Sequence, residues 1–121
     1  MIVTKSENII WVDVDDTLVL HKVSEYEYIY VTDPLGGQDI KVTPHTAMIR
    51  LLKEEKARGA HIIVHSRGGW QWALNVVEAL SLQQFVDEVK TKALVYFDDK
   101  PVDEWLRYRV YLEPNIPYKN K

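Results

Sequence analysis

The chain has 121 residues, of which 46% are hydrophobic and 27% are charged, and its formal net charge is -3. This length and composition predict one globular domain over residues 1–121. The sequence contains no cysteine, which excludes disulfides, thiolate metal sites and cysteine nucleophiles and fits a reducing, cytoplasmic compartment. No apolar run approaches the ~18 residues that span a bilayer, and the negative charge disfavours sequence-independent binding to duplex nucleic acid.

The first part of the chain predicts a strand followed by a hairpin. Residues 9–14 form an apolar, mostly β-branched run that is typical of a buried parallel strand. Two alternating segments, 25–31 and 39–42, flank a run of turn residues at 33–37. We therefore expect a β-hairpin, which makes residues 21–43 a flap inserted after the first strand.

The remainder of the chain alternates helices with strands. Thr43 is the expected N-cap of a helix that begins at Pro44 and ends at Gly59. Gly68 and Gly69 precede a second helix, whose apolar residues fall on one face. The other expected elements are strands at 60–65, 93–97 and 110–112, a short apolar segment at 85–89 and a short helix at 101–107. This alternation predicts an open α/β fold with a mostly parallel sheet and right-handed crossovers.

Carboxylates gather where the predicted strands end. Alternation along the first strand places Asp13 and Asp15 on the same side of the backbone, where two like charges repel unless a cation lies between them. Ser66 ends the strand at 60–65, and the acidic pair Asp98 and Asp99 ends the strand at 93–97. Because ligands of open α/β sheets bind beyond the carboxyl ends of the strands, these polar groups are expected to converge. The pattern indicates a hard-metal site or an acid/base pair.

These motifs resemble those of the haloacid dehalogenase (HAD) superfamily of phosphohydrolases. The first motif, Asp-x-Asp-x-Thr after an apolar strand, matches residues 13–17. The second, an apolar strand that ends in Ser or Thr, matches 62–66, and the fourth, an apolar strand that ends in an acidic pair, matches 94–99. The third is a lysine ahead of the last acidic strand, which Lys90 matches, with Lys92 as the fallback. Together the motifs cover nearly the whole chain.

The resemblance implies a Rossmann-like three-layer sandwich and a phosphatase mechanism. Asp13 would be the nucleophile and would form an aspartyl-phosphate. Asp15 would protonate the leaving oxygen and then deprotonate the water that hydrolyses the intermediate. Ser66 and Lys90, or Lys92 in its place, would hold the phosphoryl oxygens.

Magnesium is the cofactor that the resemblance implies, and it takes near-octahedral oxygen ligands in proteins. Its expected ligands are the carboxylate of Asp13, the main-chain carbonyl of Asp15 and Asp98, while Asp99 would hold a metal-bound water. An anion is also favoured at the N-terminus of the helix that follows Gly69. Contacts with the substrate are expected at Thr17, Arg67 and Gly68.

The flap is the only cap that this chain offers, as in the small, capless members of the superfamily. An open site suits a phosphorylated small molecule or a nucleic-acid end, and the segment 97–105 also resembles the phosphatase domain of polynucleotide kinases. Tyr26, Tyr28 and Tyr30 share one face of the flap. Their rings would stack on a base, or else cover the sheet or form a homodimer interface.

Two other function classes remain open at the level of sequence. Receiver-type phosphoacceptor modules share this length and an acidic pocket, but they carry the acceptor Asp at the end of a middle strand, where this chain has Ser66. A non-catalytic HAD-like protein that binds phosphate or metal is the other alternative. All matched catalytic positions carry competent residues, which favours a magnesium-dependent phosphomonoesterase.

Overall fold

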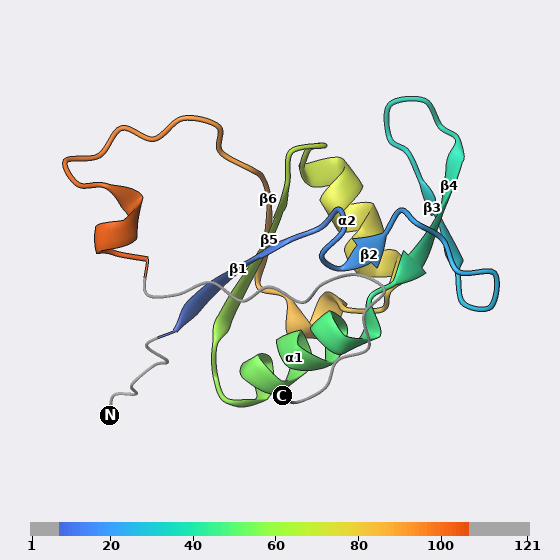
Figure 1. Ribbon diagram of the computed structural model, residues 1–121, viewed down its shortest axis with the longest axis horizontal. Coiled ribbons are helices and arrows are strands. Elements are labelled where there is room, and N and C mark those ends of the chain that lie inside the picture. The colour runs from blue at the N-terminus through green and yellow to red at the C-terminus, as the bar shows by residue number, and fades with distance from the viewer. Residues whose placement is uncertain (1–7, 107–121) are drawn as a thin grey trace.

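The computed structural model describes residues 8–106 and shows an α/β fold with two small sheets (Figure 1). The parallel sheet has the order β1-β5-β6, and the antiparallel sheet has the order β2-β4-β3. The strands are β1 (Ile9–Asp13), β2 (Val19–Leu20), β3 (Ile29–Thr32), β4 (Asp39–Pro44), β5 (His61–Ser66) and β6 (Glu88–Thr91). The helices of the described range are α1 (Thr46–Ala57), α2 (Trp70–Ala79) and the 3-10 helices η1 (Gln83–Phe85) and η2 (Val102–Glu104). No helix within residues 8–106 is long and apolar enough to cross a membrane.

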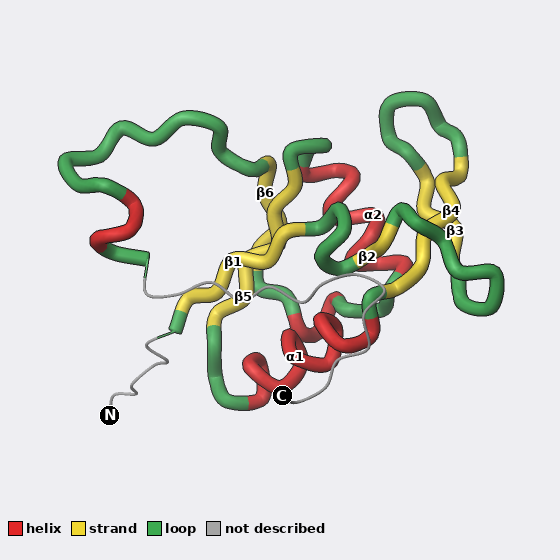
Figure 2. The backbone as a smooth tube through the Cα atoms, viewed as in Figure 1, coloured by secondary structure: helices red, strands yellow, loops and turns green. Residues whose placement is uncertain are grey.

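Both α-helices cover the same face of the parallel sheet (Figure 2). The chain crosses from β1 to β5 and from β5 to β6 in the same direction, so right-handed crossovers place α1 and α2 on one side. Val12 of β1 stands beside Val64 of β5, and both belong to the core cluster that contains Leu52 of α1 and Val76 of α2. Burial of this apolar face holds the sheet and the two helices together.

The opposite face of the parallel sheet is open at β1 among the described residues. Ile9 and Trp11 alternate with the core-facing residues of β1 and are 63% and 46% exposed, whereas Ile63 of β5, on the same face, is 5% exposed. The expected three-layer arrangement requires a layer on this face, and residues 8–106 supply none. A three-stranded parallel sheet with helices on one face is therefore the confirmed part of the predicted fold.

The predicted hairpin is confirmed, although its first strand begins at Ile29 and not at residue 25. β3 and β4 pair in antiparallel fashion, and the side chains of Val31 and Val42 turn inward and are buried. Asn75 of α2 donates an Nδ2 hydrogen to the carbonyl of Thr32 at 2.9 Å, which fastens the hairpin to the helix. The short strand β2 pairs with the end of β4. A strand of two residues is too short to show an alternation of apolar and polar side chains, so the sequence does not predict β2.

The prediction that Thr43 caps a helix beginning at Pro44 is wrong. β4 continues through Pro44, and α1 begins only after its N-cap, His45. The hydroxyl of Thr43 accepts a hydrogen bond from the amide of Ser24 at 2.7 Å and donates one to the carbonyl of Glu27 at 2.8 Å. This side chain therefore closes the base of the flap, and it is not free to cap a helix.

The predicted strand at 93–97 is also wrong, because the chain there forms an exposed segment that leaves the sheet (Figure 1). β6 runs parallel to β5 and ends at the carboxyl edge, where the amide of Lys92 donates to the carbonyl of Ser66 at 2.9 Å. A further parallel strand would have to start at the opposite edge, and such a return takes about a dozen residues. The helix expected at 101–107 is reduced to η2, and the strand expected at 110–112 lies outside the described residues.

Asp87 connects the start of β6 to α1 and β5. Nζ of Lys56 donates to both carboxylate oxygens of Asp87, at 2.9 and 2.8 Å, and the amide of Ile62 donates to Oδ2 at 2.8 Å. Burial by itself would raise the pKa of Asp87. The hydrogen bonds from Lys56 and Ile62, together with the Lys56 charge, outweigh burial and hold this pKa below its ordinary value.

Acid is therefore expected to destabilise the protein through Asp87. Because the folded pKa is depressed, the stabilisation is complete above the unfolded pKa of about 3.9 and is lost as the pH falls through the folded pKa. Asp87→Asn should lower the free energy of unfolding at pH 7 and flatten its decline between about pH 5 and pH 2. Urea unfolding of both proteins across this range measures the effect, and an unchanged pH dependence in the variant would contradict it.

Candidate active site

The turn after β1 lies at the carboxyl edge of the parallel sheet and carries the first acidic motif. The carbonyl of Val14 accepts the amide hydrogens of Thr17 and Leu18, at 3.1 and 2.9 Å. The side chains of Val14 and Leu18 are fully buried. The core therefore anchors this turn and fixes the backbone that carries Asp13 and Asp15.

Asp15 is held by donors from three other parts of the chain. Its Oδ1 accepts hydrogen bonds from Nε1 of Trp72 at 3.0 Å and from Nε2 of His21 at 2.7 Å. Its Oδ2 accepts one from the hydroxyl of Ser66 at 3.1 Å, and the same hydroxyl oxygen accepts the amide hydrogen of Gly68 at 2.9 Å. These contacts give the Asp15 carboxylate a defined orientation.

Asp13 lies beside an ammonium group. Its Oδ2 accepts a hydrogen bond from the hydroxyl of Thr17 at 3.2 Å, and its Oδ1 lies 3.5 Å from Nζ of Lys92. Lys90 instead pairs with Glu88 of its own strand, at 3.3 Å. Of the two lysines considered from the sequence, the structure brings Lys92 to Asp13 and leaves Lys90 apart.

His65 separates Lys90 from Asp13, because the register places it opposite each of them. Its ring lies against Trp11, with centroids 5.0 Å apart, and its Nδ1 is buried without a hydrogen-bond partner in the described part of the chain. Burial lowers the pKa of His65, and the charge of Lys92 lowers it further, against the opposing effect of Asp13. Burial and the Lys92 charge thus favour the neutral form of His65.

The N-terminal end of α2 approaches the same edge. The amides of Gly68 and Gly69 both donate to Ser66, to its Oγ at 2.9 Å and to its carbonyl at 3.1 Å. A Cβ at position 68 would lie 3.2 Å from Cδ1 of Trp72 and 3.3 Å from Oγ of Ser66, so glycine permits this close approach. Arg67 is exposed and forms no hydrogen bond or ion pair within residues 8–106. Among the predicted anion ligands at this end, Arg67 is thus available, whereas the Gly68 amide is already used.

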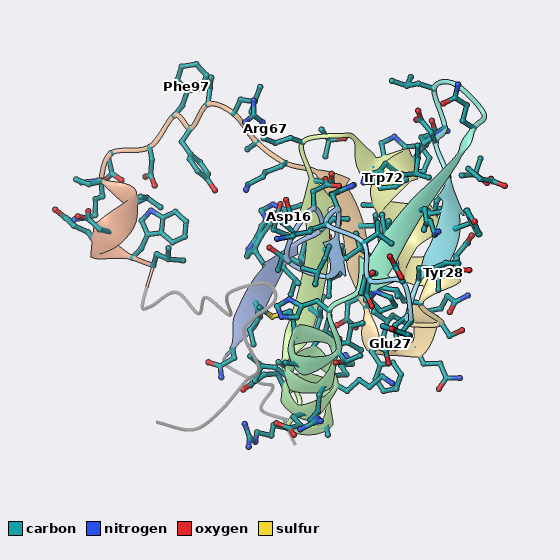
Figure 3. All side chains as sticks on the ribbon, turned by 45° about the vertical axis from the view of Figure 1, so that its right-hand side comes forward. Asp16, Glu27, Tyr28, Arg67, Trp72 and Phe97 are labelled. Carbon is teal, nitrogen blue, oxygen red and sulfur yellow. The ribbon has the colours of Figure 1, made fainter. Side chains whose placement is uncertain are left out.

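Asp98 and Asp99 are not brought to this edge. They lie on the exposed segment that follows β6, and Figure 3 shows the adjacent Phe97 far from Trp72. The amide of Asp99 donates to Oδ1 of Asp98 at 2.7 Å, and hydrogen bonds from Asp99 hold the pKa of Asp98 below its ordinary value. The structure brings together the other members of the predicted cluster, Asp13, Asp15 and Ser66.

The expected magnesium ligands are consequently not assembled. Within residues 8–106, no group of three or more His, Asp or Glu side chains is placed to hold a metal ion. Magnesium needs oxygen ligands in near-octahedral geometry, but of the three predicted ligand residues only Asp13 and Asp15 lie at this edge. Within the described part of the chain, the Lys92 ammonium pairs with Asp13, at 3.5 Å. The described residues therefore do not fit the three-residue magnesium site that the sequence predicted.

Two residues contact Asp15 in ways that the sequence does not predict. Trp72 is predicted as a core residue, and it is 7% exposed, but its indole hydrogen is also a donor to Asp15. His21 follows β2 and reaches Asp15 from the base of the flap. Helical spacing places Trp72 on the apolar face of its helix, but it gives no sign of the hydrogen bond to Asp15. No local pattern indicates the contact of His21, because it depends on the shape of the turn after β1.

Comparison with known proteins identified no relative of this chain, since no family model, no curated protein and no solved structure matches it. The site consists of a pair of carboxylates at one sheet edge, each with its own set of polar partners.

Proposed function

We propose that this protein hydrolyses phosphomonoesters through an aspartyl-phosphate, as HAD phosphatases do. The observation that carries the proposal is the different environment of two neighbouring carboxylates. Asp13 lies 3.5 Å from the ammonium of Lys92, whereas Asp15 accepts hydrogen bonds from Trp72 and Ser66 at 3.0 and 3.1 Å. A nucleophile and a general acid/base must each be held in place by different partners, because one attacks phosphorus while the other moves protons at the leaving oxygen and at water.

The proposed reaction proceeds in two displacements at phosphorus. In the first, a carboxylate oxygen of Asp13 bonds to phosphorus while the bond to the leaving oxygen breaks, and Asp15 gives its proton to that oxygen. In the second, Asp15 takes a proton from water, the water oxygen bonds to phosphorus, and the bond to Asp13 breaks. Inorganic phosphate leaves, and both side chains return to their starting protonation states.

Cationic and polar groups near Asp13 can stabilise the negative charge that develops on the phosphoryl oxygens during the reaction. The ammonium of Lys92 is placed to neutralise phosphoryl oxygens as they approach Asp13. The Thr17 hydroxyl, 3.2 Å from Asp13, orients the nucleophile. Arg67 has no protein partner in the described range and can bind a phosphoryl oxygen or a second phosphate.

Magnesium, the three-layer Rossmann-like sandwich and a cytoplasmic location also stay predictions of this proposal. A third layer would cover the open sheet face of Ile9 and Trp11, which are 63% and 46% exposed. The steps above use no magnesium, because the described residues do not supply its ligands. The substrate class stays a phosphorylated small molecule or a nucleic-acid end.

The test is the release of phosphate from p-nitrophenyl phosphate, phenyl phosphate and a 3′-phosphorylated oligonucleotide by the purified protein, with magnesium and with EDTA. Turnover that needs magnesium supports the full proposal. Turnover that persists in EDTA supports phosphomonoester hydrolysis and shows that this reaction does not need magnesium. Uptake of one phosphoryl group without turnover would indicate the phosphoacceptor alternative. The proposal would be overturned if the protein neither took up a phosphoryl group from any of these substrates nor released phosphate from them.

The two lysines provide a matched comparison. Lys92→Ala removes the positive charge 3.5 Å from Asp13, and kcat/KM is expected to fall by about ten- to a hundredfold. Lys90→Ala removes an equal charge that pairs with Glu88, so its effect is expected to stay within about threefold. Steady-state kinetics of both variants measure the difference. A larger loss in Lys90→Ala than in Lys92→Ala would contradict the assignment.

A further inference from the structure

His21 contacts the candidate acid of the site from the base of the flap. Its Nε2 lies 2.7 Å from Oδ1 of Asp15, and the two side chains are 41% and 39% exposed. A carboxylate oxygen is an acceptor, so the imidazole donates an Nε2 hydrogen in this contact. The histidine occupies the first position of the flap insertion, 21–43, and thereby links the flap to the site.

The turn after β1 positions His21. Asp16 adopts φ 61°, in the left-handed region that aspartate tolerates better than most residues, and its amide donates to the carbonyl of Val19 at 2.7 Å. In this conformation, Oδ1 of Asp16 accepts the amide hydrogen of His21 at 3.0 Å. The backbone of His21 is therefore fixed by Asp16 while its ring reaches Asp15.

Oδ1 of Asp15 has two donors, and this decides which oxygen can carry the acidic proton. The indole hydrogen of Trp72 and the imidazole hydrogen of His21 both point to Oδ1, at 3.0 and 2.7 Å. Trp72 can only donate, so Oδ1 stays an acceptor, and a proton on Asp15 is directed to Oδ2. When Oδ2 carries the proton, the Ser66 hydroxyl no longer donates to it and can turn its own hydrogen toward a phosphoryl oxygen.

We propose that His21 is a positioning residue for Asp15, and that with Trp72 it directs the transferable proton to Oδ2. This inference rests on the proposed function, since His21 can position the proton of Asp15 only if Asp15 is the general acid. A misplaced acid matters most when the leaving oxygen is basic. Hydrolysis of phenyl phosphate should therefore depend on His21 more than hydrolysis of p-nitrophenyl phosphate, whose leaving group needs little protonation.

The test compares three substitutions on these two substrates. His21→Asn removes the contact, because its amide nitrogen takes the place of Nδ1 and does not reach Asp15. His21→Gln restores a donor near the place of Nε2. His61→Asn is the matched control, since His61 makes a similar contact with Glu88, at 2.6 Å, at the opposite end of β5.

We expect His21→Asn to lose about tenfold more kcat/KM on phenyl phosphate than on p-nitrophenyl phosphate, His21→Gln to recover most of that difference, and His61→Asn to resemble the wild type. Thermal unfolding of each variant confirms that it is folded. Equal losses on both substrates, or an unaltered His21→Asn, would overturn the positioning role while the wild-type activity upheld the proposed function. A wild-type protein without activity on either substrate would overturn the proposed function first, and this inference with it.

Discussion

Asp13→Asn is expected to abolish phosphoester hydrolysis while leaving the fold intact. The amide has nearly the same shape as the carboxylate but cannot attack phosphorus, so kcat/KM should fall by about a thousandfold or more. The Thr17 hydroxyl, 3.2 Å from Oδ2, can still donate to the amide oxygen of the variant. The assay is p-nitrophenyl phosphate hydrolysis, with circular dichroism to compare the thermal unfolding of both proteins.

The control for this variant makes the same chemical change away from the site. Asp103 lies in η2, is exposed, and belongs to the segment that leaves the sheet after β6. Asp103→Asn is therefore expected to keep wild-type kinetics. Asp13→Asn with the kinetics of Asp103→Asn would show that Asp13 is not the nucleophile, whatever other residue performs the reaction.

Ile62→Ala is expected to produce a large loss of stability. Ile62 lies in β5, the central strand of the parallel sheet, and its side chain is fully buried in the core cluster. Truncation removes the transfer free energy of the lost atoms and leaves a cavity between the sheet and its helices. The free energy of unfolding should fall by about 2–5 kcal/mol, as measured by urea denaturation.

Ile9→Ala provides the comparison on the open face of the same sheet. Ile9 has the same side chain, but 63% of it is exposed, so its truncation removes little buried surface. The expected change in the free energy of unfolding is within about 0.5 kcal/mol. Similar losses for the two variants would mean that the face of Ile9 is covered in solution, and would support a third layer there.

Local periodicity predicted the elements that build the core. The apolar runs before Asp13 and Ser66 became β1 and β5, and the alternating segments on either side of 33–37 became the hairpin of β3 and β4. These signals are reliable because a buried face imposes its period on the sequence directly. Asp13, Asp15 and Ser66 could be placed at one edge for the same reason, since Asp13 and Ser66 end parallel strands and Asp15 follows the first of them.

The failures of prediction occur where a residue's partner is distant in the sequence. Residues 93–97 have the composition of a strand, but composition does not say which strand edge the chain can reach after β6. Thr43 and Pro44 have the sequence signature of a helix start, but the flap uses the Thr43 hydroxyl and β4 continues through Pro44. In each case a tertiary constraint outweighed a local preference.

The sequence by itself thus determined the parallel strands β1 and β5, the flap and the presence of two carboxylates at a sheet edge, because each leaves a period or a spacing along the chain. Only the tertiary structure decided the partners of those carboxylates. The resemblance to HAD motifs favoured Lys90, but the register of β6 places His65 between Lys90 and Asp13 and allows Lys92 to reach Asp13. Likewise His21 has no local signature, since its contact with Asp15 arises from a turn that folds the chain back on itself. A hydrogen bond between distant residues depends on where the folded backbone carries them, and no short stretch of sequence contains that information.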